Sequence, residues 1–219
     1  MLGIALVLLS YQEPVLPGSQ TPESTLHQRA SAARAAGRSE DYREEIQAFR
    51  ADDDVDLEIL VSESDAIVDA TVGERFKFSL AEDGQRIYSV GSLHVHKWLK
   101  GAPRPRVLRF VRPGGVVKFA DGIVAQQTVR GPFRLPAPGK RYILFLARDA
   151  RGWNMLYGPQ GAFEISYETS AVGDIRPADL REDATVASTF RDQPSTKLLQ
   201  AIEQILTPAP VSKPADAKQ

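Results

Sequence analysis

The fold of this chain is decided by a stretch that reads Gly139-Lys140-Arg141-Tyr142-Ile143-Leu144-Phe145-Leu146. The apolar run that follows the turn at Gly139 is too short for a typical helix, and it lacks the alternation of a half-exposed strand. Such a run predicts a strand that is buried on both faces. A second strand is expected just after Gln160-Gly161, at residues 162–167. We expect these two strands to lie at the centre of a closed or two-layered β structure.

More strand-like segments precede and separate these two. The expected strands cover residues 66–78, 86–99, 106–111, 116–119, 123–129, 141–147, 153–157 and 162–167. Asp83-Gly84 and Pro113-Gly114-Gly115 provide turns between them, because Gly and Asp-Gly adopt the backbone angles of a tight reversal. Short strands separated by turn signals every eight to twelve residues or so are typical of a β-sandwich or a small barrel. The chain is therefore predicted to be mainly β with flanking helices.

Charge is strongly segregated along the chain, although the net charge is only −1. Residues 1–85 carry 17 acids and 7 Lys or Arg, whereas residues 86–151 carry 14 Lys or Arg and only two acids, Asp121 and Asp149. A basic block of this kind binds either an anionic partner or an acidic part of the same chain. At 219 residues the chain is long enough for one domain with appendages.

The N-terminal segment and the absence of cysteine bear on the cellular compartment of the protein. The chain has no cysteine, which excludes disulfides, thiolate metal sites and a cysteine nucleophile. Residues 2–9 form an apolar run that is too short to span a bilayer but has the length of a signal-peptide core. We therefore predict a secreted or periplasmic protein without a transmembrane span. A buried apolar N-terminus in a cytoplasmic protein is the alternative, because no basic residue precedes the run.

The sequence divides into five parts. They are a signal-like start and flexible leader (1–21), an acidic helical arm (22–64), an OB-like barrel (65–168), a connecting segment with a C-terminal helix (169–206) and a disordered tail (207–219). In the tail, Pro, Ala and Lys offer little apolar surface to bury. Within residues 169–206, a turn or short helix is expected at 176–180 and a helix at 196–206, capped by Ser195.

The acidic arm, defined as residues 22–64, is predicted to hold three helices. The first covers residues 21–36, with Thr21 as its N-cap and Gly37 as its stop. The second covers residues 40–50, where Tyr42, Ile46 and Phe49 recur at helical spacing. The third follows the acidic run 52–54 and covers residues 55–62. We expect the arm to dock on the basic block through this apolar stripe and its acids.

Several of these motifs resemble the bacterial netrin-like modules related to tissue inhibitors of metalloproteinases. The resemblance covers about residues 55–168 and rests on Ser64-Asp65-Ala66-Ile67-Val68, Trp98-Leu99-Lys100-Gly101, Pro113-Gly114-Gly115, residues 139–146 and Gln160-Gly161-Ala162-Phe163. It implies a small antiparallel OB-like β-barrel with flanking helices, in an exported protein. The animal inhibitors act through an N-terminal cysteine and disulfides. Since this chain has no cysteine, protease inhibition does not carry over.

Two motifs have the residue types of a metal site. His94 and His96 are spaced to project from one face of a strand, but a stable site usually needs a third ligand, and the only other histidine is His27. Asp52, Asp54, Asp56 and Glu63 match four ligand positions of an EF-hand loop. Leu57 occupies the position where that loop requires Gly, so we interpret the run as the acidic start of a helix. No metal or other cofactor is predicted.

The basic block suggests a binding surface. The candidate polyanion contacts are Arg104, Arg106, Arg109, Arg112, Lys118, Arg134 and Arg141. With Phe110, Phe119 and Phe133 nearby, they fit a single-stranded nucleic-acid site; the favoured reading is solvated charge on the strands with Phe110 packed inward. Export would leave a protein or an anionic glycan as the partner. No residue is assigned to catalysis, because no hydrolase or phosphate-loop motif occurs; Asp65 and Asp69 form the only carboxylate pair considered.

We therefore interpret the chain as an exported, non-enzymatic β-barrel module that binds a protein or an envelope component. A nucleic-acid or polyanion binder that uses residues 86–151 is the alternative, and an unrecognised hydrolase is the third reading.

Overall fold

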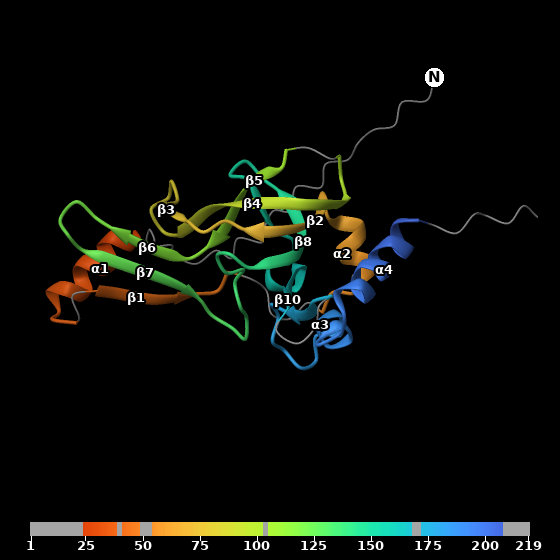
Figure 1. Cartoon of the computed structure of the whole chain (residues 1–219). Helices are drawn as coiled ribbons and strands as arrows, with labels where there is room; N and C mark the ends of the chain where they lie inside the picture. The colour runs from red at the N-terminus through yellow and green to blue at the C-terminus, as the bar shows by residue number, and fades with distance from the viewer. Residues whose placement is uncertain (1–23, 39–40, 49–53, 103–104, 168–171, 208–219) are drawn as a thin grey trace, which may run out of the picture.

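A computed structural model describes residues 24–38, 41–48, 54–102, 105–167 and 172–207 (Figure 1). The strands in these ranges are β1 (Asp41–Ile46), β2 (Ala66–Val72), β3 (Lys77–Leu80), β4 (Ile87–Lys100), β5 (Val107–Pro113), β6 (Gly115–Lys118), β7 (Val124–Val129), β8 (Arg141–Arg148), β9 (Trp153–Met155), β10 (Ala162–Ser166) and β11 (Asp174–Pro177). The helices are α1 (Leu26–Ala35), α2 (Leu57–Glu63), α3 (Thr185–Phe190) and α4 (Ser195–Leu206), with the short 3₁₀ helix η1 (Gly158–Gly161). Among the described residues, no helix has the length and apolar character needed to span a membrane.

Five strands close into a barrel. The ring runs β8–β2–β4–β5–β9 and returns to β8, and every neighbouring pair is antiparallel except β5 and β9. Those two strands are parallel and meet at Phe110 and Trp153, which closes the ring. The expectation of a mainly β protein with a barrel and flanking helices is thereby confirmed.

Strand β8 is buried on both faces, as its sequence predicts. Leu144 and Leu146 point into the barrel, where they join Val68, Leu93 and Phe110. Ile143 and Phe145 point outward, yet they are equally buried because helices and the β10–β11 pair cover them. Fully burying each of these side chains contributes about 1.5–3 kcal/mol of transfer free energy.

The outer cover of β8 is built by α2, α3 and α4 (Figure 1). Leu198 and Ile202 of α4 are fully buried in it, and the helix expected at residues 196–206 is thereby confirmed. The predicted cap is wrong, because Pro194 occupies the N-cap position. Ser195 lies inside the helix, and its hydroxyl donates to the carbonyl oxygen of Val172 at 2.8 Å.

A second, three-stranded sheet lies at the opposite end of the molecule from these helices (Figure 1). Its order is β1–β7–β6, with β1 parallel to β7 and β6 antiparallel to it. Helix α1 packs on this sheet: Leu26 and Ala30 are buried against Ile87, Ile123 and Ala125. The sheet is joined to the barrel through β4, since Ile87 is the first residue of that strand.

The helix expected at residues 40–50 is wrong, because residues 41–46 form strand β1. Tyr42, Glu44 and Ile46 are half-buried and alternate with exposed residues, which is the period of a strand. The spacing of Tyr42 and Ile46 fits both a helix and a strand, and pairing with β7 decides between them. Phe49 lies outside the described residues. The arm of residues 22–64 is therefore not wholly helical.

The other expected arm helices are present with shifted starts. Helix α1 begins at Leu26 behind a capping box formed by Thr25 and Gln28, and it ends just before Gly37, whose φ of 71° is the stop expected there. Thr21 lies outside the described residues. Helix α2 begins at Leu57, because the Asp56 carboxylate accepts a hydrogen bond from the backbone N–H of Ile59 at 2.7 Å.

Three further boundaries differ from the sequence prediction. The strand expected at 66–78 is divided into β2 and β3, which both pair with β4. The turn or short helix expected at 176–180 is wrong at its start, where β11 pairs with β10. Helix α3 has no side-chain cap from a neighbouring residue; its first N–H, from Thr185, donates to the distant Asp54 carboxylate at 2.9 Å. A signal from so far along the chain cannot be recognised in the local sequence.

Candidate functional site: a groove on the outer face of β4 and β5

The outer face of the β4–β5 pair bears exposed side chains, among them His94, Val107 and Arg109. Ser92 is paired with Arg109, and His94 with Val107. Their neighbours Leu93 and Leu108 are buried inside the barrel, so these pairs point outward. The turn between β3 and β4 (residues 81–86) and the turn between β8 and β9 (residues 149–152) flank this face.

Two adjoining cavities form a groove here, which we call the β4–β5 groove. The smaller cavity has a volume of about 560 Å³ and the larger one about 790 Å³. Arg109, Asp149, Ala150 and Arg151 line both cavities, so they form the wall between them. A groove with two compartments suits an extended chain, because a single compact ligand would occupy only one of them.

Aromatic side chains line both compartments. Both tryptophans of the chain, Trp98 and Trp153, line the smaller cavity, and Tyr88 lines the larger one. Arginines lie over two of these rings: the guanidinium carbon of Arg148 is 5.6 Å from the Trp153 ring centre, and that of Arg151 is 4.5 Å from the Tyr88 ring centre. These cation–π contacts hold the two arginines at the groove wall.

Arg109 is the cation at the centre of the groove. It is exposed, and no carboxylate among the described residues lies within ion-pair distance of it. Arg151 beside it is already paired, because its guanidinium donates to Asp149 Oδ2 at 2.9 Å. The hydrogen bond with Asp149 raises the pKa of Arg151. Burial raises the pKa of Asp149, but the hydrogen bonds from Arg151 and Gly152 outweigh it and hold the pKa below its usual value.

Each compartment of the groove also has carboxylates that the other lacks. Asp65 lines the smaller cavity, where its Oδ2 accepts a hydrogen bond from the backbone N–H of Arg148 at 2.8 Å. Glu82 and Asp83 line the larger cavity. Arg109 therefore lies in the wall that the two compartments share, and each compartment has at least one further carboxylate of its own.

The basic residues singled out in the sequence do not form one surface. Arg106 and Arg109 are exposed at β5, and Arg104 lies outside the described residues. Lys118 lies on β6, and Arg134 lies between β7 and β8. Phe110 is fully buried inside the barrel, so it offers no stacking surface.

Two of these arginines are engaged by the protein itself. The guanidinium of Arg112 lies 3.9 Å from the Phe76 ring centre and donates to the carbonyl oxygen of Pro136, and burial lowers its pKa. Arg141 forms an ion pair with Asp69 at 2.6 Å. The prediction that they contact a polyanion has no support in this geometry.

Sequence reasoning missed the aromatic side chains and Arg148 and Arg151 of the groove. Trp98 lies near the end of β4 and Trp153 begins β9, so only closure of the barrel brings them together. In the sequence, Trp98 is assigned only to an expected strand and to a motif of the netrin-like resemblance. The sequence could have indicated this site only if the two tryptophans had been considered together with the turn at residues 149–152.

The histidine pair has ordinary surface partners. His94 and His96 are exposed; His94 Nε2 is 3.4 Å from the Ser92 hydroxyl and His96 Nε2 is 2.7 Å from the Thr71 hydroxyl. The third histidine, His27, is 2.9 Å from Asp121 at the other end of the molecule. The described residues contain no group of three or more His, Asp or Glu placed to hold a metal ion.

The carboxylates of the acidic run have separate partners. Asp54 binds Thr185 at the start of α3, Asp56 caps α2, and Glu63 accepts a hydrogen bond from the Tyr157 hydroxyl. Asp52 lies outside the described residues. Asp65 and Asp69 also have separate partners, Arg148 and Arg141, so they do not form a carboxylate pair that shares a substrate.

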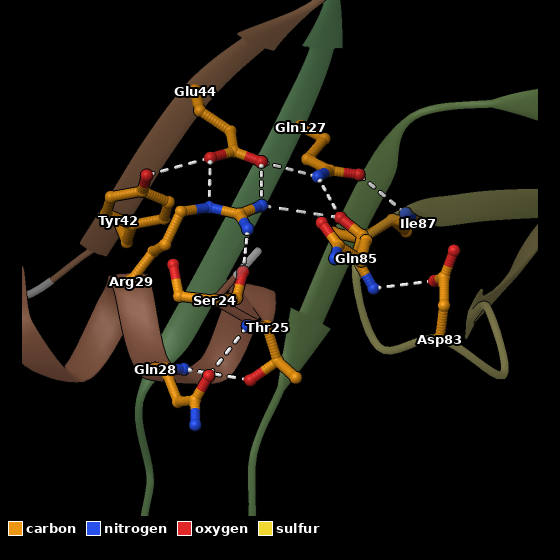
Figure 2. A network of polar contacts seen from close by, with 10 residues as sticks. All are labelled: Ser24, Thr25, Gln28, Arg29, Tyr42, Glu44, Asp83, Gln85, Ile87 and Gln127. Carbon is orange, nitrogen blue, oxygen red and sulfur yellow. Dashed lines mark hydrogen bonds and ion pairs between the residues drawn. The ribbon is translucent and has the colours of Figure 1, made fainter. Parts of the chain in front are cut away.

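A dense polar network joins the acidic arm to the second sheet (Figure 2). The Glu44 carboxylate accepts hydrogen bonds from Arg29 at 2.9 and 3.1 Å, from the Tyr42 hydroxyl at 2.8 Å and from the Gln127 amide at 2.5 Å. Gln127 is itself buried, and its Oε1 accepts from the backbone N–H of Ile87 at 2.6 Å. All these polar groups have protein partners, so the network holds the arm in place and leaves no free group for chemistry.

The arm therefore docks, but mainly within the second sheet. Glu44 binds Arg29 of the arm itself and Gln127 of β7, and Glu45 lies 4.0 Å from Arg130 of the basic block. Within residues 41–48, no acid contacts Arg106 or Arg109.

Comparison of the chain with protein-family models, with curated proteins and with solved structures found no match.

Proposed function

We propose that this chain is a non-enzymatic binding module with an OB-like barrel of the netrin-like type. The order of the ring supports this. Its first three strands, β2, β4 and β5, form an antiparallel meander, β8 lies beside β2, and β9 closes the ring by a parallel contact with β5. Five strands in this closed order are the pattern of an OB-like barrel.

The β4–β5 groove is the proposed binding face, and its position is the observation that carries the proposal. OB-like barrels bind their ligands across the second and third strands, between the loops after the first and the fourth. In this chain those strands are β4 and β5, and the corresponding turns include residues 81–86 and 149–152. The groove occurs at that place, and it holds the unpaired Arg109. The expected position of a binding site comes from analogy with the fold, whereas the expectation that this groove binds a ligand rests on its side chains.

The residue types favour a protein partner. Trp, Tyr and Arg dominate the binding energy of protein–protein interfaces, because they combine large buried area with a polar group. Trp98, Trp153 and Tyr88 lie in this groove together with three arginines. Export remains part of the proposal and rests on residues 2–9, which lie outside the described residues. Cell fractionation with sequencing of the mature N-terminus tests it; a cytoplasmic protein with an intact start would contradict it.

Site-specific photo-crosslinking tests the binding face. Val107 lines the smaller cavity and is 50% exposed, so it can be replaced by p-benzoylphenylalanine without disturbing the core. Val172 is 53% exposed, lines neither compartment and serves as the matched control. Irradiation of the cells that produce the protein should give a discrete adduct from position 107 and none of that size from position 172. Identical adduct patterns, or no adduct from position 107, would refute the assignment of the face.

A further inference from the structure

We infer that the β4–β5 groove takes a peptide segment of the partner in which an acidic side chain binds Arg109 and apolar side chains on either side enter the two compartments. This inference rests on the proposed function and adds the chemistry of its ligand.

Arg109 supplies the central contact. Its side chain lines both compartments, so a ligand that runs along the groove must pass it. A carboxylate can accept two parallel hydrogen bonds from a guanidinium, which makes this pairing both strong and directional. The neighbouring cations are partly committed: Arg151 is held by Asp149, and Arg148 lies over Trp153. Arg109 is thus the groove arginine that the structure leaves for an incoming carboxylate.

The two compartments supply apolar contacts on either side of Arg109. Trp98, Val107 and Trp153 line the smaller one. Leu80, Tyr88 and Val90 line the larger one. Apolar side chains of a peptide would remove these partly exposed surfaces from water, which favours binding.

The charge pattern distinguishes a peptide from a uniform polyanion. A nucleic acid or a sulfated glycan carries negative charge along its whole length. In this groove it would meet Asp65 in one compartment and Glu82 and Asp83 in the other. Like charges that are brought together in this way oppose binding. A peptide with one acidic residue between neutral or basic ones matches the groove, because its charge is confined to the middle.

Selection from a library of displayed, short randomised peptides tests this inference. The baits are the wild-type protein, Arg109→Gln and the control Lys118→Gln, since Lys118 is exposed on β6 and lines neither compartment. Thermal unfolding of each bait verifies that it is folded. The wild type and Lys118→Gln should enrich peptides with Asp or Glu flanked by apolar residues, and Arg109→Gln should lose this preference.

The affinity of the most enriched peptide is then measured by tryptophan fluorescence, because both tryptophans line the smaller cavity and no other tryptophan contributes signal. We expect roughly tenfold weaker binding to Arg109→Gln and less than about a twofold change for Lys118→Gln, as for loss of one charge-assisted contact. The same titration with a peptide whose acidic residue is replaced by its amide should show a similar loss for the wild type.

Heparin and oligothymidylate are titrated in parallel to separate two kinds of failure. If either polyanion quenches the fluorescence in an Arg109-dependent way while no acidic peptide is enriched, the groove binds a ligand but the inferred peptide is wrong. If no peptide is enriched and neither polyanion binds through Arg109, the proposed binding face is wrong as well. Enriched peptides without an acidic residue would also overturn the inference.

Discussion

Arg141 binds Asp69 through two parallel hydrogen bonds, from Nε to Oδ1 at 2.7 Å and from the terminal nitrogen to Oδ2 at 2.6 Å. The Asp69 side chain is only 7% exposed, so this ion pair links strands β2 and β8 at a place that is largely shielded from water. Arg141 also donates to the Tyr167 hydroxyl at 2.7 Å. The hydrogen bond with Asp69 raises the pKa of Arg141. Arg141, which the sequence offered as a polyanion contact, is thus bound to a carboxylate of the neighbouring strand.

Arg141→Met should destabilise the protein by about 1.5–3 kcal/mol, because it leaves a buried carboxylate without its charged donors. Lys140→Met is the matched control: Lys140 is exposed and lies 3.8 Å from Glu164, and loss of such a surface pair costs about 0–1 kcal/mol. Urea unfolding at neutral pH measures both. Equal losses for the two variants would show that the Arg141–Asp69 pair has no special weight.

Phe145→Ala should cost about 3–5 kcal/mol, the usual range for a core aromatic side chain. Phe145 is fully buried, and its ring meets the edge of Phe163 with 5.9 Å between the ring centres. Phe78 is 48% exposed, so Phe78→Ala should cost clearly less. Denaturant unfolding compares the two. A loss under about 1 kcal/mol for Phe145→Ala would remove the outer face of β8 from the core.

Glu44→Gln should reduce stability at neutral pH and flatten its acid dependence. Burial raises the pKa of Glu44, but hydrogen bonds from Arg29, Gln127 and Tyr42 outweigh it and hold the pKa below its usual value of 4.5. A depressed pKa means that the contribution is complete above the usual value and is lost as the pH falls through the folded-state pKa. The difference in unfolding free energy between wild type and Glu44→Gln should therefore shrink below about pH 4.

The control for this pH dependence is Glu45→Gln, because Glu45 is exposed on the same strand. Its acid profile should follow that of the wild type. Parallel profiles for the wild type and Glu44→Gln would show that the network of Figure 2 does not depend on the ionised carboxylate.

His94→Ala combined with His96→Ala should leave stability within about 0.5 kcal/mol of the wild type, since both side chains are exposed. Titration with zinc or nickel should show no tight site. A submicromolar affinity that the double substitution abolishes would instead identify a metal site at these two residues.

Deletion of residues 1–54 should destabilise the barrel. It removes α1 and β1, so β7 loses its parallel partner and Ile87, Ile123 and Ala125 lose the cover of Leu26 and Ala30. It also removes Asp54, which caps α3. Thermal unfolding of the truncated chain measures the loss; an unchanged midpoint would show that the arm is dispensable.

The sequence predicts the barrel strands because their signals are local. The apolar run 142–146 and the turn at Pro113-Gly114-Gly115 need no knowledge of distant residues. Strand β1 and helix α3 are different, because β7 and Asp54 determine them from far along the chain. The groove cannot be predicted from local sequence for the same reason. Arg109 was among the residues that the sequence singled out, but its surroundings exist only after β9 has closed the ring on β5.

Strand β4 passes through all three apolar clusters of the protein. Ile87 belongs to the cluster under α1, Leu93 to the barrel interior, and Leu99 to the helical cover near α4. A single strand, β4, therefore connects the second sheet, the barrel and the helical cover, which would otherwise unfold separately. Amide hydrogen exchange along its 14 residues should report a single global opening event, with no earlier release of the second sheet from the barrel.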